Sequence, residues 1–432
     1  MSRREQTYDA LDEEGARDNI STIKSSDASA KQFVEQTTDP DAIRYLVEDE
    51  EIDRHFHGHN NDTREKILRS ETTPFDVKQT VLDRDENYNR DRDSLGTIRV
   101  PDRVEHNART ALQVGKPVVL YGPTGTGKTH FAKQLLAEAC LDYELATATP
   151  TWTPGDITGN IQPELDDGDV EYRREAGCVS RGIQQADRYG EWGVLLDEIT
   201  RADISQVFGP LYTAVEDDSQ TIFVDGEGRD LQLTDDVNIV CTMNMSDRTV
   251  NELDDAITRR FAMIELRGYE EADRRKLYDD WLDAEPVFEG ETTVGSIDPT
   301  PESGFTPGRE QLIDLFEAHH KGINEGGTTD EDTPITEFGP MHYRDVIQFV
   351  GVACGDDGAY ATRHARAVGE AFATYVAPRL LNTAALPQIE RLADHYRTLD
   401  EAFSVFDLGP VVELVERQAE TERRGIVGGA YE

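Results

Sequence analysis

The stretch Val118-Val119-Leu120-Tyr121-Gly122-Pro123-Thr124-Gly125-Thr126-Gly127-Lys128-Thr129 decides the fold. It opens with a short apolar run, which is typical of a strand buried on both faces of a sheet. The glycine-rich part fits the pattern G-x-x-x-x-G-K-[ST], and the residues that follow, to Ala139, are predicted to be helical. Glycines let backbone N–H groups turn inward around phosphate oxygens, and the helix directs its positive N-terminal end at the same anion. The stretch therefore predicts a strand, a phosphate-binding loop and a helix.

Two side chains of this loop are predicted to act on a bound nucleoside triphosphate. Lys128 is expected to reach the β- and γ-phosphates, and the hydroxyl of Thr129 is expected to ligate Mg²⁺. The rest of the loop is expected to contact the phosphates through Gly122, Pro123, Thr124, Gly125, Thr126 and Gly127. The chain is therefore predicted to be a nucleoside triphosphatase.

A pair of carboxylates, Asp197 and Glu198, directly follows a second apolar run at 194–196. Asp197 is expected to hold the Mg²⁺ shell, and Glu198 to orient and deprotonate the attacking water. The alternative is an acidic strand end in an acidic protein. The spacing after three apolar residues, downstream of the phosphate loop, favours the catalytic interpretation.

Further polar residues follow the next predicted strand, 237–241. Asn244 lies at its end, where the carboxyl ends of parallel strands converge on a ligand, so it is expected to hydrogen-bond the γ-phosphate or the water. Arg259 and Arg260 come near the end of a predicted helix, which can present one of them to the γ-phosphate of a neighbouring subunit. The alternative for this pair is ordinary ion pairing with local acids.

The order of elements indicates an α/β core with a parallel sheet covered by helices on both faces. Strands are expected at 118–121, 145–149, 194–196 and 237–241, with a helix before them at 102–114 and helices between them at 182–189 and 204–216. Two stretches interrupt this alternation and are predicted to be β-hairpins, 160–175 and 221–233.

Composition divides the chain into three regions. Residues 1–95 are polar and acidic, and are expected to be partly disordered with short helices at 41–56 and 75–83. Residues 96–268 are the expected α/β core. Residues 269–432 are expected to form a helical lid and C-terminal region, with helices at 270–281, 342–352, 363–376 and 386–403. Within it, 285–335 is rich in Gly, Thr, Pro and acidic residues and is expected to be an irregular insertion.

The charge balance is extreme, with 87 acidic residues against 44 basic ones and a net charge of -43. A carboxylate-rich, lysine-poor chain is typical of a salt-loaded, halophilic cytoplasm, where counter-ions screen self-repulsion. An acidic mesophilic protein with a disordered arm is the alternative, but the acidity runs through the whole chain. The charge argues weakly against a broad nucleic-acid-binding face, so a DNA partner stays open.

The cysteine, histidine and hydropathy patterns argue against a metal site, disulfides and a membrane span. The four cysteines have no CxxC spacing, so neither a zinc site nor a disulfide framework is expected. His55, His57 and His59 alternate, but no fourth ligand lies near them, so a polar segment is favoured over a metal site. No apolar run reaches about 18 residues, so we expect no signal peptide, no membrane span and a cytoplasmic location.

Over residues 97–400 the chain resembles the AAA+ superfamily, in its MoxR and dynein-related branch. The run Met243-Asn244-Met245-Ser246-Asp247-Arg248, then Leu253-Asp254-x-Ala256 and Arg259-Arg260-Phe261, looks most like McrB-like ATPases. The run Leu196-Asp197-Glu198-Ile199-Thr200-Arg201-Ala202 is similar to the DEINRA run of that branch, with Thr200 in place of Asn.

The resemblance implies an AAA+ core with a helical lid and assembly into a ring, typically a hexamer. It implies an arginine finger at Arg259 or Arg260, and it places the lid arginine of related proteins at Arg344, in Met341-His342-Tyr343-Arg344-Asp345. It also implies that the two predicted hairpins are inserts of the branch.

The resemblance leaves the biological role open between several functions. The leading hypothesis is an ATP-driven ring that remodels or translocates a partner macromolecule, with a von Willebrand A-type protein as a candidate partner. The second is a GTP- or ATP-driven motor subunit of a DNA restriction system, acting with a separate nuclease. Residues 1–95 show no DNA-reading pattern, and nothing selects guanine over adenine, so ATP is assumed. A non-enzymatic scaffold is disfavoured because Lys128, Asp197, Glu198 and the arginine pair are all present.

Overall fold

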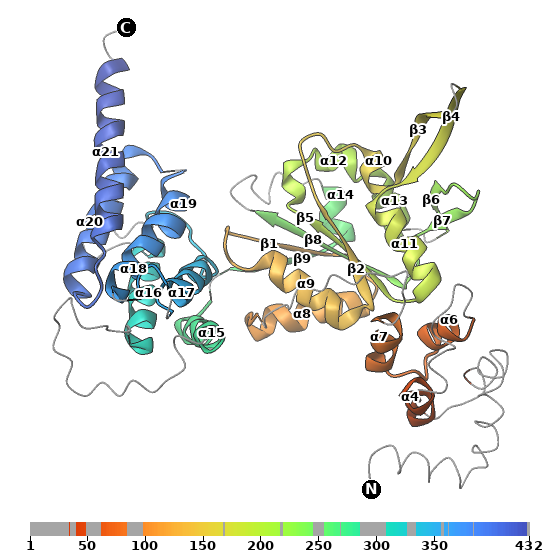
Figure 1. Cartoon of the computed structure of the whole chain (residues 1–432). Coiled ribbons are helices and arrows are strands. Elements are labelled where there is room, and N and C mark those ends of the chain that lie inside the picture. Colours follow the sequence, from red (N-terminus) through yellow and green to blue (C-terminus); the bar gives the residue numbers. More distant parts are fainter. Residues whose placement is uncertain are drawn as a thin grey trace, which may run out of the picture.

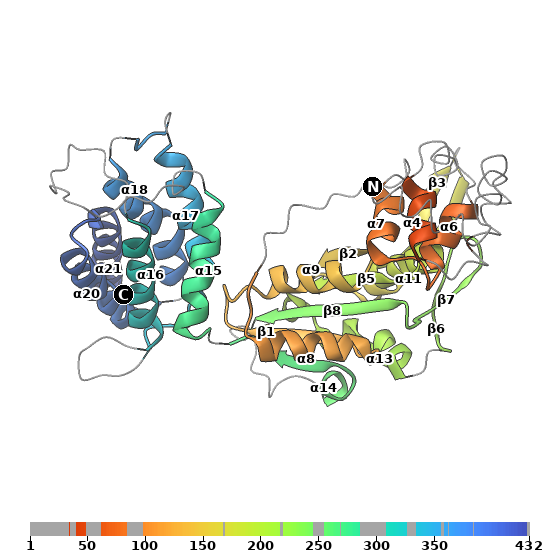
Figure 2. The same cartoon turned by 90° about the horizontal axis from the view of Figure 1, so that it is seen from below.

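The computed structural model describes Val34 and residues 40–48, 62–83, 98–166, 169–216, 219–244, 255–267, 269–285, 308–325, 334–355, 358–361, 363–382 and 384–429. Its elements form an α/β core and a helical lid that lie side by side, with three N-terminal helices at the end of the core farthest from the lid (Figures 1 and 2). None of the helices in these ranges is long and apolar enough to cross a membrane.

The core is built on one five-stranded sheet with the order β2-β5-β8-β1-β9. Every neighbouring pair in it is parallel. Its strands are β1 (Val118–Gly122), β2 (Asp142–Thr147), β5 (Trp192–Asp197), β8 (Val237–Asn244) and β9 (Ala262–Glu265). The predicted parallel α/β fold is confirmed. The edge strand β9 was not predicted, because it closely follows the predicted helix end at Arg259 and Arg260 with no glycine or proline to mark a boundary.

Alternate residues of the central strands enter two different hydrophobic clusters, as expected when successive side chains point to opposite faces. Val118 and Leu120 pack with α8 (Asp102–Gln113) and α9 (Lys128–Ala139) on one face. Val119 packs with α11 (Cys178–Tyr189) on the other face. The second face is also covered by α10 (Pro154–Ile157), α12 (Ile204–Val207), α13 (Gly209–Glu216) and α14 (Asp255–Arg260). The cluster with α8 continues into the lid, so core and lid share buried apolar side chains.

Two antiparallel hairpins leave the core near α11, as predicted. The first pairs β3 (Gly159–Asp166) with β4 (Asp169–Ala176), and the second pairs β6 (Thr221–Val224) with β7 (Asp230–Gln232). Arg174 donates a hydrogen bond from Nη1 to the carbonyl oxygen of Val224 at 3.0 Å, which joins the two hairpins. They therefore form one connected surface at that end of the core (Figure 1).

The N-terminal region contains the short helices α4 (Pro40–Glu48), α6 (Asp62–Arg69) and α7 (Phe75–Asp83). The predicted helix at 75–83 is confirmed, and α4 confirms the first part of the predicted 41–56, whose remainder, 49–56, lies outside the described residues. Helix α6 was not predicted. Ile67 and Leu68 are buried in the same cluster as α11, so these helices pack on the core. His55, His57 and His59 lie outside the described residues.

The lid is helical, as predicted. The prediction of an irregular insertion over 285–335 is wrong for Arg309–Asn324, which form a helix. The elements of the lid are α15 (Glu271–Asp283), α16 (Arg309–Asn324), α17 (His342–Ala353), α18 (His364–Ala371), a π-helical turn (Phe372–Val376), α19 (Ala377–Leu381), α20 (Leu386–Ala402) and α21 (Gly409–Gly429). Within 285–335 the structure has the helix α16, whose Leu312, Ile313 and Phe316 are buried. Glycine- and threonine-rich flanks dominate the composition there and obscured this apolar spacing. The flanks 286–307 and 326–333 lie outside the described residues.

Candidate nucleotide-binding site

The phosphate loop joins β1 to α9, where the sequence predicted it. Gly125 and Gly127 have φ of 77° and 89°, a left-handed conformation that glycine adopts without strain. A Cβ on Gly122 would lie 2.3 Å from the carbonyl oxygen of Leu266, so only glycine fits there. Helix α9 begins at Lys128, so the free backbone N–H groups of its first turn point at the loop.

Lys128 is buried at the mouth of the loop. Its Nζ donates hydrogen bonds to the carbonyl oxygens of Gly122 at 3.1 Å and Pro123 at 2.7 Å. The ammonium group therefore lies inside the curve of the loop, where an anion would replace these carbonyl partners.

Thr129 and Asp197 meet beside the loop. The hydroxyl of Thr129 donates to Oδ1 of Asp197 at 2.7 Å. Thr242 of β8 donates to the same oxygen at 2.5 Å, and its own hydroxyl accepts the backbone N–H of Glu198 at 2.9 Å. A hydroxyl and a carboxylate side by side are the oxygen donors that Mg²⁺ takes together with substrate phosphates. Thr242 was not predicted, although a polar residue in the apolar run of β8 is a signal for it.

Glu198 has an unusual backbone conformation, with φ of 54°. Its Oε2 is ion-paired with Nη2 of Arg201 at 2.6 Å. Its Oε1 accepts a hydrogen bond from Nδ2 of Asn244 at 3.4 Å. The strand ends of β5 and β8 thus bring Glu198 and Asn244 together, as the sequence predicted for parallel neighbours.

A cavity of about 750 Å³ lies between the phosphate loop and the lid. Lys128, Thr129, Glu198 and Asn244 line it from the core, and the lid contributes a set that includes Met341, His342, Asp345 and Arg379. The lid also bonds to the loop itself. Tyr269 donates its hydroxyl to the Thr126 carbonyl at 2.9 Å, and the backbone N–H of Met341 bonds to the Gly125 carbonyl at 2.9 Å.

Arg379 of α19, rather than Arg344, is the lid arginine that lines this cavity. It donates to Nδ1 of His342 at 2.7 Å and to Asp345 at 2.7 Å. Burial, with a smaller effect of the Arg379 charge, lowers the pKa of His342 to about 4, so the imidazole is neutral and accepts this bond. Arg344 lies near Glu285 instead. Burial raises the pKa of the Glu285 carboxyl, and the charge of Arg344 opposes that shift. The sequence missed Arg379 because an arginine in a five-residue helix carries no spacing signal.

The two arginines at the end of α14 differ in environment. Arg260 donates from Nε to the Tyr212 carbonyl at 3.0 Å, pairs with Glu216 at 2.8 Å and lies over the Tyr212 ring at 5.6 Å. Arg259 is exposed. Neither residue lines the cavity of its own chain. Residues 245–254, which carry part of the McrB-like run, lie outside the described residues.

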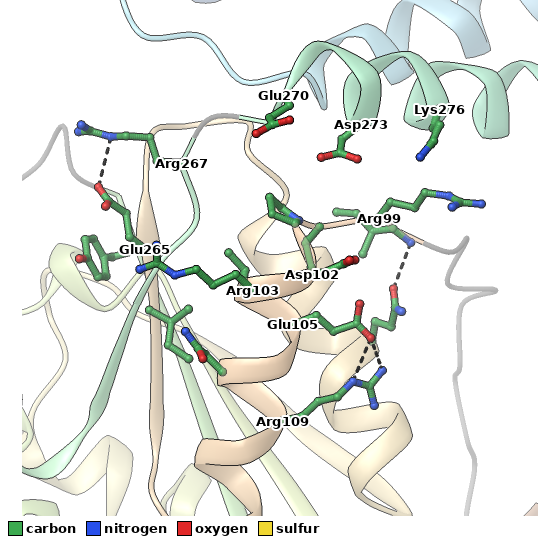
Figure 3. Close-up of a pocket in the computed structure, with 18 of the residues that line it drawn as sticks. Arg99, Asp102, Arg103, Glu105, Arg109, Glu265, Arg267, Glu270, Asp273 and Lys276 are labelled. Carbon is green, nitrogen blue, oxygen red and sulfur yellow. Dashed lines mark hydrogen bonds and ion pairs between the residues drawn. The ribbon is translucent and has the colours of Figure 1, made fainter.

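A second cavity, of about 860 Å³, lies between α8, β9 and α15 (Figure 3). Its walls mix both signs of charge, with Arg103, Arg267 and Lys276 beside Asp102, Glu270 and Asp273. Arg99 pairs across it with Asp280 of the lid at 2.6 Å. None of the predicted site residues lines this cavity, so it is a cleft between core and lid, separate from the phosphate loop.

Comparison with known proteins agrees with this geometry. Residues 117–261 match the model of the AAA domain of the dynein-related subfamily. The core is an AAA+ domain. Over 188 residues the chain is 26% identical to the EcoKMcrB subunit of a type IV methyl-directed restriction enzyme from Escherichia coli K12, and the match covers 40% of each chain. The AAA+ domain thus has McrB-like features, while the chain spans less than half the length of that relative.

Among solved structures, a RuvB mutant from Thermotoga maritima is 15% identical with a TM-score of 0.38, over 74% of this chain and 88% of that one. NtrX from Brucella abortus is 12% identical with a TM-score of 0.37, over 77% and 68%. The AAA+ fold of the core is established by the family match together with the parallel sheet and its phosphate loop.

Proposed function

We propose that this chain is an ATP-hydrolysing AAA+ ring ATPase that couples hydrolysis to the remodelling or translocation of a partner macromolecule. The observation that carries the proposal is the convergence of polar side chains beside the phosphate loop. Lys128, Thr129, Glu198 and Asn244 line one cavity, and Asp197 is bonded to Thr129 next to it. A lysine, a hydroxyl, paired carboxylates and an amide are the groups that phosphoryl transfer to water requires.

Each group has a distinct task in this reaction. The loop N–H groups and Lys128 hold the β- and γ-phosphates. Thr129 and Asp197, whose oxygens are 2.7 Å apart, would hold Mg²⁺, which when bound neutralises charge on the phosphate oxygens. Glu198 orients a water and accepts its proton as the new P–O bond forms and the bond to the departing ADP oxygen breaks. Asn244 holds the water or the γ-phosphate beside Glu198.

The site is completed by a second copy of the chain, in a ring that we propose to be hexameric. Arg259 is proposed as the finger that reaches the γ-phosphate of the neighbouring copy. Arg260 is tied to Tyr212 and Glu216 of its own chain, so its role is to fix the end of α14. From the lid, Arg379 is proposed to leave Asp345 and contact the γ-phosphate of its own chain.

A second candidate function is supported by the 26% identity to the subunit of a methyl-directed restriction enzyme. In that case the chain is a GTP- or ATP-driven motor subunit acting with a separate nuclease. The two candidates differ in nucleotide preference and in their response to DNA. Turnover that DNA stimulates, with GTP preferred over ATP, favours the restriction motor. ATP turnover that is indifferent to DNA favours the remodelling ATPase.

Phosphate release by the purified chain tests the proposal. Assays belong in concentrated KCl, because a net charge of -43 repels itself in dilute buffer. Glu198→Gln is expected to keep ATP binding and to lower turnover by about 10²- to 10⁴-fold, the usual contribution of a general base. Lys128→Ala is expected to lose binding. Unchanged turnover in Glu198→Gln would remove the hydrolytic assignment.

A further inference from the structure

His342, the first residue of α17, lies between the phosphate loop and Arg379. Its Nδ1 accepts a hydrogen bond from Nη1 of Arg379 at 2.7 Å. The other side of the ring packs on the loop, where a Cβ on Gly125 would overlap Nε2 of the imidazole. The ring therefore contacts both the loop and the arginine that the lid adds to the same cavity.

The two ring nitrogens of His342 have different tasks. Burial lowers the pKa of His342 to about 4, so the ring is neutral and has one donor and one acceptor nitrogen. A guanidinium can only donate, so Nδ1 is the acceptor and the proton is on Nε2. Nε2 can then donate to the backbone of Thr124, which hydrogen-bonds the ring. One imidazole thus links the backbone of the loop to the lid arginine.

The lid backbone just before His342 fixes the imidazole against the loop. The N–H of Gly339 bonds to the Thr124 carbonyl at 3.2 Å. The N–H of Met341 bonds to the Gly125 carbonyl at 2.9 Å. Two consecutive carbonyls of the loop are therefore held by this lid segment, so the position of the His342 ring follows the position of the loop.

Arg379 has two acceptors of different kinds. Its Nη1 donates to the neutral imidazole of His342, and its Nη2 donates to the carboxylate of Asp345 at 2.7 Å. The pair with Asp345 is exposed, with side chains 42% and 36% accessible, so it is weak and screened by salt. A phosphate anion in the cavity competes with Asp345 for Nη2, whereas the neutral imidazole does not repel that anion. Nη1 can therefore stay on His342 while Nη2 turns to the phosphate.

We infer that His342 is a positioning residue that holds Nη1 of Arg379 beside the phosphate loop, so that Nη2 is directed at the γ-phosphate. This inference rests on the proposed contact between Arg379 and that phosphate. A guanidinium that is held in place before the nucleotide binds lowers the ordering cost of the contact. ADP has no γ-phosphate, so His342 raises the affinity for ATP relative to ADP.

Two amide substitutions separate the two contacts of His342. In His342→Gln the amide nitrogen replaces Nε2 and the acceptor for Arg379 is lost. This variant is expected to bind a non-hydrolysable ATP analogue about three- to ten-fold more weakly, the usual net effect of one hydrogen bond, with ADP affinity within about two-fold of the parent. In His342→Asn the amide oxygen replaces Nδ1, so the ratio of analogue to ADP affinity should stay near that of the parent.

Equilibrium titration with Mg²⁺ in concentrated KCl measures both affinities, and retained ADP binding shows that a variant is folded. His106→Gln is the matched control, since His106 is an exposed histidine of α8 that does not line the cavity. This control is expected to bind both nucleotides as the parent does.

A double-mutant cycle tests whether His342 acts through Arg379. In the Arg379→Ala background, His342→Gln should have no further effect on the affinity ratio, because no guanidinium remains to be held. Equal losses in both backgrounds, or a loss in His342→Asn as large as that in His342→Gln, would overturn the inference. If Arg379→Ala itself leaves the ratio unchanged, the proposed γ-phosphate contact fails and the inference fails with it. If Arg379→Ala lowers the ratio and His342→Gln does not, the inference alone is wrong.

Discussion

The α/β core and the helical lid use their charged side chains in opposite ways. In the core, Lys128, Thr129 and Glu198 line an open cavity where a ligand can complete their interactions, and Asp197 lies beside it, bonded to Thr129. In the lid, Arg274 and Glu317 are each only 9% accessible and satisfy one another between α15 and α16. His319 lies deeper still, with its two ring nitrogens bonded to Tyr343 and Tyr396.

Under the proposed function, this difference would separate the chemistry of the core from mechanical coupling through the lid. The core groups are arranged to exchange partners, so their removal should affect turnover more than folding. The lid groups fix helices to one another, so that bonds such as Tyr269 to Thr126 connect a firm body to the phosphate loop. The predictions below test this division.

The largest expected effect is that of Arg259, which the proposed ring shares between copies. Arg259→Ala should lower turnover by about 10³-fold or more, as for other arginine fingers, with ATP binding and the melting temperature preserved. Arg260→Ala should instead lower the melting temperature, because Arg260 pairs with Glu216 at 2.8 Å. Phosphate release and thermal melts of the two variants separate these outcomes.

Mixed rings provide the control for that assignment. Lys128→Ala subunits cannot bind the triphosphate, and Arg259→Ala subunits cannot supply the finger, so mixing the two inactive forms should restore part of the turnover. If confirmed mixed rings stay inactive, or if Arg260→Ala behaves as Arg259→Ala does, the shared site is wrong.

The buried pair of the lid should give the next largest effect, on stability. Arg274→Leu leaves the Glu317 carboxylate buried without its partner and should lower the free energy of unfolding by about 3–5 kcal/mol. The double variant Arg274→Leu/Glu317→Leu should recover most of this loss, because two apolar side chains replace the pair. Denaturant titration measures both. An equal loss in the double variant would mean that packing, rather than the unpaired charge, causes the damage.

The sequence predicted the core well because its function requires fixed residue types at fixed spacing. The phosphate loop follows β1, Asp197 and Glu198 lie at the end of β5, and Asn244 ends β8, where the pattern placed them. The lid was predicted less well, since α16 lies between composition-biased flanks and Arg379 reaches the cavity only through the folding of distant helices. Thr242 is an intermediate case. The sequence shows a polar residue in this strand, but only the register of β5 against β8 shows that its partner is Asp197.

Variants of Arg379 and Arg344 test whether the structure or the sequence identifies the functional arginine of the lid. Arg379→Ala should lower kcat/KM for ATP by about 10-fold or more, because it removes the proposed charge-assisted bond to the γ-phosphate, whose loss costs about 1.5–3 kcal/mol. Arg344→Ala, in the same lid but outside the cavity, should leave kcat/KM within about two-fold, as expected for a surface change. The reverse ranking would restore the assignment that the sequence alone suggested.

The smallest effect should be a dependence of lid stability on pH. Burial lowers the pKa of His320 to about 3 and that of His395 to about 4, and it holds the pKa of His319 well below its usual range. The unfolded chain therefore binds protons near pH 6.5 that the folded lid does not accept. The contribution of these neutral histidines to the free energy of unfolding is fully present above pH 6.5. It is lost as the pH falls toward 4, by about 1.4 kcal/mol per pH unit for each histidine.

The core contains carboxylates that also titrate in acid, so the histidine contribution must be isolated by difference. His395 is the suitable position, because its Nε2 has no hydrogen-bond partner among the described residues and glutamine can still donate to the backbone of His319. His395→Gln removes one titrating group from the lid and should make the fall in melting temperature between pH 6.5 and 5 shallower than in the parent. Equal slopes for parent and variant would assign the acid sensitivity to the carboxylates. A shallower slope would instead show that the buried histidines of the lid contribute to the pH response.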